Sequence, residues 1–190
     1  MQKEGDLQEN GIRVTNTSSG RFAGRSVIYG KDDEHDTPYM TRYWIGRLRL
    51  HIFYRGDQDP DCHDHPWDFW TLPFSPYVEE VIVTGQGDWE RFKQIIPALR
   101  WSFRPAEHTH RVLGRWDGAM RVGAMTYHAT AFSKPLLGEE PVGSPGRLVT
   151  LVWRSREKRS WGFWKYRLGE FCWVGWREYV FGNGKNSPCQ

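Results

Sequence analysis

The chain has 190 residues, which is enough for one well-buried domain and short for two. Its formal charge is +3, from 26 Lys and Arg against 23 Asp and Glu, too mild a balance to indicate a nucleic-acid-binding protein. The polar N-terminus lacks an apolar targeting segment, and no stretch approaches the roughly 18 apolar residues of a membrane helix. Three cysteines, Cys62, Cys172 and Cys189, have no metal-type pair spacing and predict no disulfide framework. We therefore expect a cytoplasmic protein in a reducing compartment.

The chain divides by amino-acid composition into three parts. Residues 1–37 are rich in Gly, Ser, Asn and charge, and they predict a polar, extended arm with one edge strand and a disordered start. Residues 38–182 predict a single β-domain, and residues 183–190 a C-terminal tail. With 11 Trp, 8 Tyr and 10 Phe, we expect an aromatic core.

The segment YWIGRLRLHIFYRG, residues 43–56, alternates apolar and polar residues and predicts a half-buried strand. Leu48, Leu50 and Ile52 share one face, and Arg49 and His51 share the other. Further strands are predicted at 77–83, 87–92, 99–103, 110–113, 121–131, 147–153 and 171–180, most of them separated by Gly, Pro, Asn or Asp. Many short strands, with no amphipathic helix of three turns, are typical of an all-β sandwich or barrel.

Four of the seven histidines lie in two His-x-His pairs, His63 with His65 and His108 with His110. In a strand the side-chain direction repeats every two residues, so each pair presents both imidazoles on one face. Imidazole is a good ligand for iron, nickel, copper and zinc. The pairs therefore predict a metal site. Cys62 adjoins His63 and should point to the other face, so we do not count it as a ligand.

These residues resemble the motifs of the cupin superfamily. DCHDHPWDF is similar to the first cupin motif, in which His-x-His supplies two ligands, and RPAEHTHRV resembles the second, with Pro105 and His110 in register. The flanking segments also resemble cupin-like proteins of bacteria and phages. The resemblance implies an all-β, cupin-type double-stranded β-helix, or jelly-roll, barrel behind the N-terminal arm, with His63, His65 and His110 as ligands.

Two positions depart from the cupin pattern. Glu107 replaces the Gly of the second motif, and Phe69 and Trp70 stand where a ligand Glu usually follows the second His. We favour a three-His centre without a carboxylate, as in cysteine-dioxygenase-like cupins. The alternative is a fourth ligand from Glu80, Glu79 or Asp68, of which Glu80 is our candidate.

A small barrel encloses a pocket about one small molecule wide. The side chains that we expect to line it are Arg49, His51, Trp67, Phe69, Trp101 and Phe103. His108 and Tyr127 are candidates for general acid or base. We predict one divalent transition metal ion, with Fe(II) favoured over Zn, Ni or Mn, and a dioxygenase-type reaction on a small molecule. The alternatives are a Lewis-acid isomerase or lyase, and a non-catalytic ligand-binding or structural protein. A homodimer is also expected.

Overall fold

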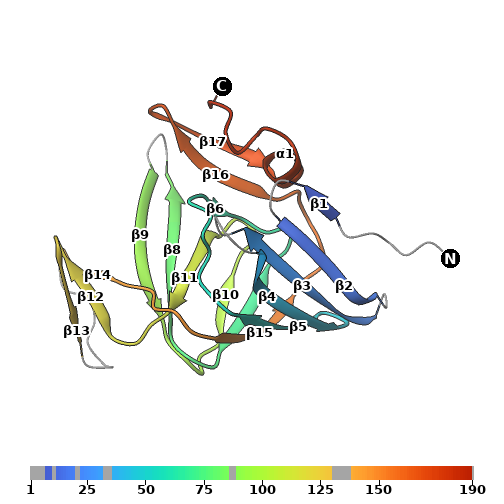
Figure 1. The fold of residues 1–190 in the computed structure, drawn as a ribbon, viewed down its shortest axis with the longest axis horizontal. Helices are drawn as coiled ribbons and strands as arrows, with labels where there is room; N and C mark the ends of the chain where they lie inside the picture. Colours follow the sequence, from blue (N-terminus) through green and yellow to red (C-terminus); the bar gives the residue numbers. More distant parts are fainter. Residues whose placement is uncertain are drawn as a thin grey trace.

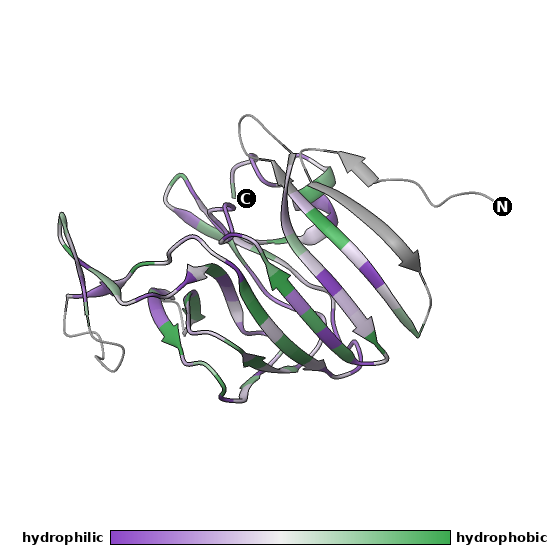
Figure 2. Cartoon of the chain, turned by 60° about the horizontal axis from the view of Figure 1, so that its bottom comes forward, coloured by the Kyte–Doolittle hydropathy of each residue, from purple (hydrophilic) through white to green (hydrophobic). Residues whose placement is uncertain are grey.

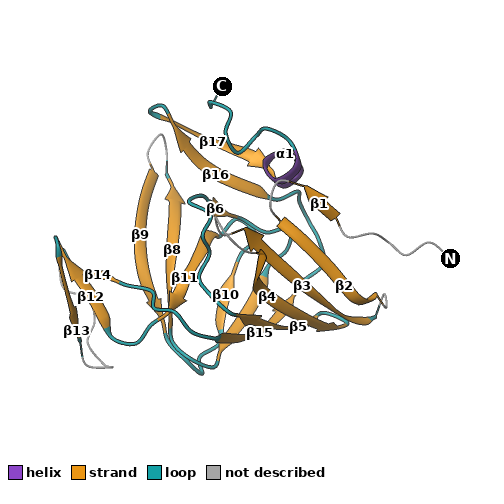
Figure 3. Cartoon of the chain, viewed as in Figure 1, coloured by secondary structure: helices purple, strands orange, loops and turns teal. Residues whose placement is uncertain are grey.

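The computed structural model describes residues 7–9, 12–19, 22–31, 36–85, 89–129 and 138–189. Most of these residues form β-strands, and the short helix α1 (Trp176–Phe181) follows the last strand (Figure 3). Neighbouring strands pair antiparallel in three sheets.

The first sheet forms one wall of the molecule (Figure 1). Its strands, in spatial order, are β1 (Leu7–Glu9), β2 (Ile12–Ser19), β3 (Ala23–Lys31), β4 (Asp36–Ile45), β5 (Leu48–Phe53), β15 (Leu148–Arg154), β7 (Phe69–Pro73) and β10 (Ser102–Arg104).

The second sheet forms the opposing wall. Its strands, in spatial order, are β17 (Glu170–Gly175), β16 (Gly162–Arg167), β6 (Cys62–His63), β11 (Thr109–Arg115), β8 (Tyr77–Thr84) and β9 (Trp89–Ile96). Along the strands hydrophobic and hydrophilic residues alternate in many places (Figure 2), as expected where one face is buried.

Both walls contribute to the hydrophobic core between them. Its buried members are Met40, Phe53, Tyr77, Ile96, Val112 and Leu148. Burying such side chains stabilises the fold by about 1.5–3 kcal/mol each. The core fills one part of the barrel interior, and the histidines fill another.

A third, three-stranded sheet projects to the side of the barrel (left in Figure 1). It contains β13 (Met125–His128), β12 (Ala119–Val122) and β14 (Glu140–Pro141). The single strand predicted over 121–131 is thus a hairpin, because Gly123 turns the chain with a φ of +54°. Residues 130 and 131 of that prediction lie outside the described residues.

Other predicted elements differ from the structure. The strand expected over 43–56 is interrupted at Gly46, whose φ of +55° allows a tight turn between β4 and β5. The arm contributes three strands instead of one, because β1, β2 and β3 extend the first sheet. The disordered start that we expected falls on residues 1–6, outside the described part of the chain.

The C-terminal region also differs from its prediction. The strand expected over 171–180 ends at Gly175, where α1 begins, because Trp176 stacks on Trp161 and Tyr179 stacks on Phe163. These packing contacts override the β-propensity of the aromatic side chains.

The residues after α1 are held against the barrel. The buried ammonium of Lys165 donates hydrogen bonds to the carbonyls of Gly184 and Ser187. A disulfide joins Cys172 to Cys189, so the expectation of no disulfide is wrong. These two cysteines lie 17 residues apart in sequence, and only the fold brings them together.

No helix in the described residues is long and apolar enough to cross a membrane.

Candidate metal centre

The first histidine pair begins at β6. His63 and His65 are two residues apart and direct their rings to the same side, with centroids 5.2 Å apart. Cys62 and Asp64 point away and are completely or almost completely buried. The backbone N–H of His65 donates to the carbonyl of Ala106, which fixes the chain beyond the strand.

Asp64 anchors this segment from behind. Its carboxylate accepts hydrogen bonds from the backbone N–H of Gly162 and from the side chains of Arg159 and Trp173. The residue between the two histidines is therefore held on three sides, and the direction of both rings is fixed.

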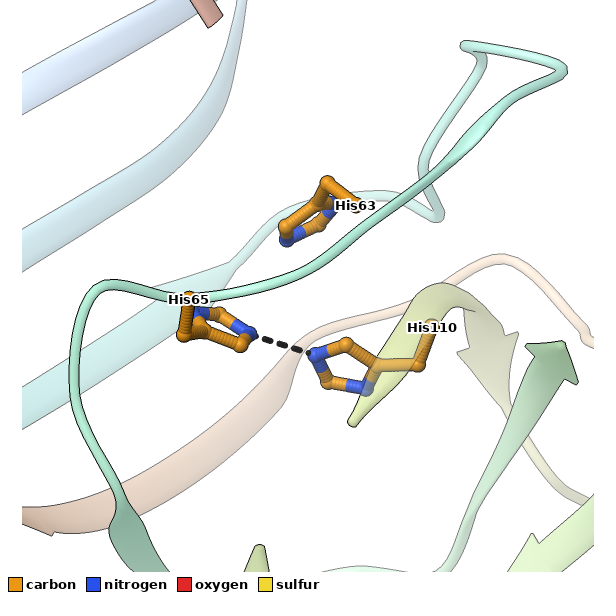
Figure 4. A group of neighbouring side chains, drawn as sticks. All are labelled: His63, His65 and His110. Atoms are coloured by element: carbon orange, nitrogen blue, oxygen red, sulfur yellow. Dashed lines mark hydrogen bonds between the residues drawn. The ribbon is translucent and has the colours of Figure 1, made fainter. Parts of the chain in front are cut away.

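The third histidine lies on the neighbouring strand. His110 of β11 is the direct cross-strand partner of His63. Its ring centroid is 5.4 Å from that of His63 and 5.1 Å from that of His65. Figure 4 shows the three rings converging, with Nε2 of His65 and Nε2 of His110 only 2.9 Å apart.

Glu79 of β8 holds the other side of the His110 ring. One carboxylate oxygen, Oε1, contacts Nδ1 of His110 and lies 2.7 Å from Nε2 of His108. The other oxygen, Oε2, accepts hydrogen bonds from Arg104 at 2.9 Å and from Gln94 at 3.3 Å. A carboxylate on Nδ1 favours a proton there, which leaves the lone pair of Nε2 directed towards the other two rings.

The electrostatics agree with that arrangement. Burial alone would raise the pKa of Glu79, but the electrostatic effect of the neighbouring His110 and the hydrogen bonds from His108 and His110 lower it. Glu79 is thus a buried carboxylate in its charged form. Burial, together with the charges of His110 and His108, lowers the pKa of His63 to about 3. Burial also lowers the pKa of His65 well below its ordinary value.

These residues fit a transition metal ion. One nitrogen from each of His63, His65 and His110 lies within 4.8 Å of the others. Two nitrogens each about 2.1 Å from one ion lie about 3 Å apart when they subtend a right angle there, which is close to the separation of the His65 and His110 nitrogens. Low pKa values keep His63 and His65 neutral, which metal binding requires. A second group of donors, formed by Glu79, His108 and His110, shares His110 with the first.

The remaining carboxylate candidates face elsewhere. Glu80 follows Glu79 on β8, so its side chain points to the opposite face, where it accepts hydrogen bonds from Arg91 and Arg111. Asp68 accepts from the backbone N–H of Ala106 and pairs with Lys158 at 2.7 Å. Neither joins a group of metal donors among the described residues.

Aromatic rings cover the histidines. Phe69 is 4.6 Å from His65 and 6.2 Å from His110, measured between ring centroids. Phe163 is the cross-strand neighbour of His63 on its other side, and Trp161 lies 6.1 Å from His63. Apolar rings exclude water from the space beside the donors, which strengthens electrostatic interactions there.

Four of the expected pocket residues lie on the inner side of the barrel. Phe69 contacts the histidines directly, and Arg49 and His51 share the face of β5 that carries the buried Phe53. Trp67 packs under the guanidinium of Arg154, which lies 4.4 Å from the ring centroid.

The other two expected pocket residues lie outside. Trp101 and Phe103 are 46% and 48% exposed. Trp101 lines an outer groove of about 490 Å³ with Leu48, Trp70, Leu151 and Trp153, and Phe103 lines a smaller one beside it. Phe103 points outwards because its neighbours on β10, Ser102 and Arg104, occupy the inner face. These grooves lie on the far side of the sheet from the histidines.

The two candidates for acid or base differ in position. His108 lies beside His110 and contacts Glu79. Tyr127 belongs to the projecting sheet, is 40% exposed, and donates its hydroxyl to Glu139. The structure therefore does not bring Tyr127 to the histidines, because the hairpin of β12 and β13 carries it to the side of the barrel.

Some residues at the centre had no signal in the sequence. Asp57 places a carboxylate oxygen 4.0 Å from Nδ1 of His63. Burial and the charge of Asp59 raise the pKa of Asp57 to about 6. Arg104 and Gln94 also orient Glu79 without belonging to any motif.

Comparisons with known proteins give matches among solved structures only. No family model and no curated protein matches the sequence. Among solved structures, the chain is similar to FeII HppE, at 8% identity and a TM-score of 0.40, covering 69% of this chain and 56% of that one. It is also similar to hydroxypropylphosphonic acid epoxidase from S. wedmorenis, at 5% identity and a TM-score of 0.32, covering 69% and 50%. A variant of Bacillus subtilis oxalate decarboxylase matches at 11% identity and a TM-score of 0.34, covering 83% and 29%.

The chain thus spans about half the length of the first two proteins and less than a third of the decarboxylase. Within its described residues this chain is an all-β protein with curled antiparallel sheets, as the strand pattern predicts. Similarity at this level carries no information about activity.

Proposed function

We propose that this chain is a metal-dependent, cupin-type enzyme in which His63, His65 and His110 bind one divalent transition metal ion and a small molecule reacts beside it. The observation that supports this best is the position of His110. Its Nε2 lies 2.9 Å from Nε2 of His65, while its Nδ1 is held by the buried carboxylate of Glu79. A histidine oriented by a carboxylate behind it is the usual arrangement of a metal ligand.

The ligand set that we propose is three histidines, with Glu79 behind them. Glu79 already contacts His108, His110, Arg104 and Gln94, so its two oxygens are engaged in orienting other groups. Glu80 would have to leave two arginines to reach the ion. We therefore favour the three-His centre and assign Glu79, in place of Glu80, as the carboxylate of the site.

Three protein ligands leave coordination positions open, so Fe(II) bound there would supply dioxygenase-type chemistry on a chelating small molecule. The residues of the chain would then do three things. The histidines and Glu79 fix the donor atoms, and Phe69 and Phe163 exclude water. His108 acts as a positioning residue, because its Nε2 is engaged with Glu79. Zn, Ni or Mn would favour Lewis-acid chemistry instead.

The cytoplasmic location stays a prediction from the sequence. The bond between Cys172 and Cys189 is the feature that argues against it, since disulfides are rare in reducing compartments.

The experiment that tests the proposal is elemental analysis of protein prepared without chelator or histidine tag. We expect about one transition metal ion per chain, and loss of nearly all of it in the double variant His63→Ala, His65→Ala. His128→Ala is the matched control, because His128 is exposed on the projecting sheet. A folded wild type that retains no transition metal after loading with Fe(II), Zn, Ni or Mn would refute the metal centre.

A second measurement separates the reaction classes. Oxygen consumption by the Fe(II)-loaded protein, followed over a panel of small acids and amines, should exceed that of the double variant. If the metal is retained but no oxygen is consumed, the dioxygenase proposal is wrong and Lewis-acid chemistry is the remaining enzymatic explanation.

A further inference from the structure

A row of polar side chains crosses the inner face of the first sheet. Ser26 of β3 pairs with Arg42 of β4, Arg42 pairs with His51 of β5, and His51 pairs with Thr150 of β15. Cross-strand partners share one face of a sheet. Thr150 is buried on the same face of β15 as the core residue Leu148, so the row faces the interior of the barrel.

Two more arginines lie on this face. Arg49 is two residues from His51 on β5, and its cross-strand partner on β15 is Val152. Arg154 is two residues beyond Val152 and therefore points the same way. Arg42, Arg49 and Arg154 thus lie on the inner face of three neighbouring strands, and Nη1 of Arg49 donates to the carbonyls of Gly46 and Leu48.

These positive charges lack carboxylate partners. Among the described residues, no carboxylate forms an ion pair with Arg42 or Arg49. Arg154 has only Glu157, at 4.0 Å and 68% exposed. Elsewhere in the barrel each of five arginines contacts a carboxylate; these are Arg91, Arg104, Arg111, Arg159 and Arg167.

Unused hydrogen-bonding atoms mark the same place. Ser26 is 2% exposed and its hydroxyl has no hydrogen-bond partner in the structure, and the same holds for buried Nε2 of His51 and Nε of Arg154. Burial and the charge of Arg154 lower the pKa of Arg42, and burial with both neighbouring arginines lowers that of Arg49 to about 10. Buried polar groups normally find partners, so these atoms indicate a ligand.

The cluster is adjacent to the histidines. Arg154 is the cross-strand partner of Phe69, and the Phe69 ring contacts His65 with centroids 4.6 Å apart. Phe69 therefore adjoins both groups.

We propose that Arg42, Arg49 and Arg154 form an anion subsite that binds the carboxylate or phosphoryl group of the substrate, whose other end reaches the histidine centre. The proposal rests on the proposed function for that second end only. Guanidinium groups bind both kinds of anion through paired N–H donors, and they do so more strongly where water is excluded. Ser26 and His51 would add hydrogen bonds to the same oxygen atoms.

The test is calorimetric titration of the folded protein with succinate, with inorganic phosphate and with neutral succinamide. Each titration is carried out on metal-loaded protein and on protein stripped with a chelator, with metal content measured in both. We expect one of the two anions to bind in both preparations, succinamide not to bind, and Arg42→Met or Arg49→Met to weaken binding at least about tenfold. Arg47→Met is the matched control, because Arg47 is exposed beside Arg49.

A thermal melt distinguishes a binding role from a structural one. If the arginines serve a ligand, Arg42→Met should melt at the same or a higher temperature than wild type without anion, because an unpaired buried charge is removed. It should also lose the stabilisation that the anion gives to wild type. A variant that melts lower and binds the anion as wild type does would overturn the subsite.

The results separate the two proposals. Arginine-dependent anion binding by a protein that holds no metal even after loading would leave the subsite standing and refute the metal centre. Retention of metal without arginine-dependent binding of either anion, or anion binding only when metal is present, would refute the subsite alone.

Discussion

The stretch from Asp57 to His65 contributes to two buried polar clusters that differ in how their charges are matched. In the first, the Asp61 carboxylate accepts hydrogen bonds from both terminal nitrogens of Arg167, Nη1 and Nη2. It also accepts one from the hydroxyl of Tyr179. Asp59 pairs with Lys185 at 2.8 Å. Every charge in this C-terminal cluster has an opposite partner.

In the second cluster, at the histidine centre, neutral rings converge instead. His63 and His65 have low pKa values, and among the described residues their nitrogens form a metal-donor group with His110 alone. Matched charges hold two parts of a chain together, whereas converging donors need something to bind. We infer that the first cluster holds α1 and the following residues against the barrel. The second cluster, in contrast, serves to bind a ligand.

The largest effect should come from breaking the C-terminal cluster. Asp61→Ala leaves Arg167 and Tyr179 without their shared partner, so the free energy of unfolding should fall by about 3–5 kcal/mol. Urea denaturation measures this, with Glu157→Ala as the exposed control. Metal content per folded chain should stay as in wild type. A variant that is stable but metal-free would abolish the distinction between the two clusters.

A smaller effect should come from the adjacent pair on β8. Glu79→Gln removes the charge behind His110, so metal affinity should fall about 10–100-fold. Glu80→Gln is the matched neighbour and should leave metal affinity unchanged, because its side chain contacts arginines on the other face. Competition with a chromogenic chelator measures both. If only Glu80→Gln released the metal, Glu80 would be a fourth ligand and the assignment of Glu79 would be wrong.

The most gradual effect, spread over several pH units, should appear in the stability of the metal-free protein. Folding lowers the pKa of His63 and of His51 from 6.5 to about 3. Between these values the unfolded chain binds protons that the folded chain does not, so stability is present above pH 6.5 and is lost as the pH falls towards 3.

The slope should be about 1.4 kcal/mol per pH unit for each such histidine. Chemical denaturation at several pH values measures it. His51→Gln should reduce the slope, and His128→Gln should not. A flat profile would mean that the rings are not buried as neutral groups.

The sequence predicts His63 and His65 well, because their shared direction follows from a spacing of two in an extended chain. It predicts His110 only through the motif resemblance, since periodicity alone does not separate it from His108. Glu79 and Glu80 could not be distinguished, because β8 is buried on both faces from Tyr77 to Ile82 and carries no alternation.

Other features depend on contacts between distant parts of the chain. Aromatic residues predict burial, yet Trp101 and Phe103 lie on the outer face of the first sheet, because the inner face of β10 holds Ser102 and Arg104. The bond between Cys172 and the C-terminal cysteine has no local signal either. Arg42 and Arg154 look like ordinary strand residues until the sheet places them beside Arg49.

The pairing of β6 with β11 sets a condition on when the centre can exist. His65 and His110 are 45 residues apart, and His63 meets His110 because the two are Cα partners in one register. A slip of one residue would turn His110 to the opposite face and separate the donors. The donor set is therefore complete only after the long loop between the strands has closed, so uptake of an ion reports native strand pairing and should follow the folding of the barrel.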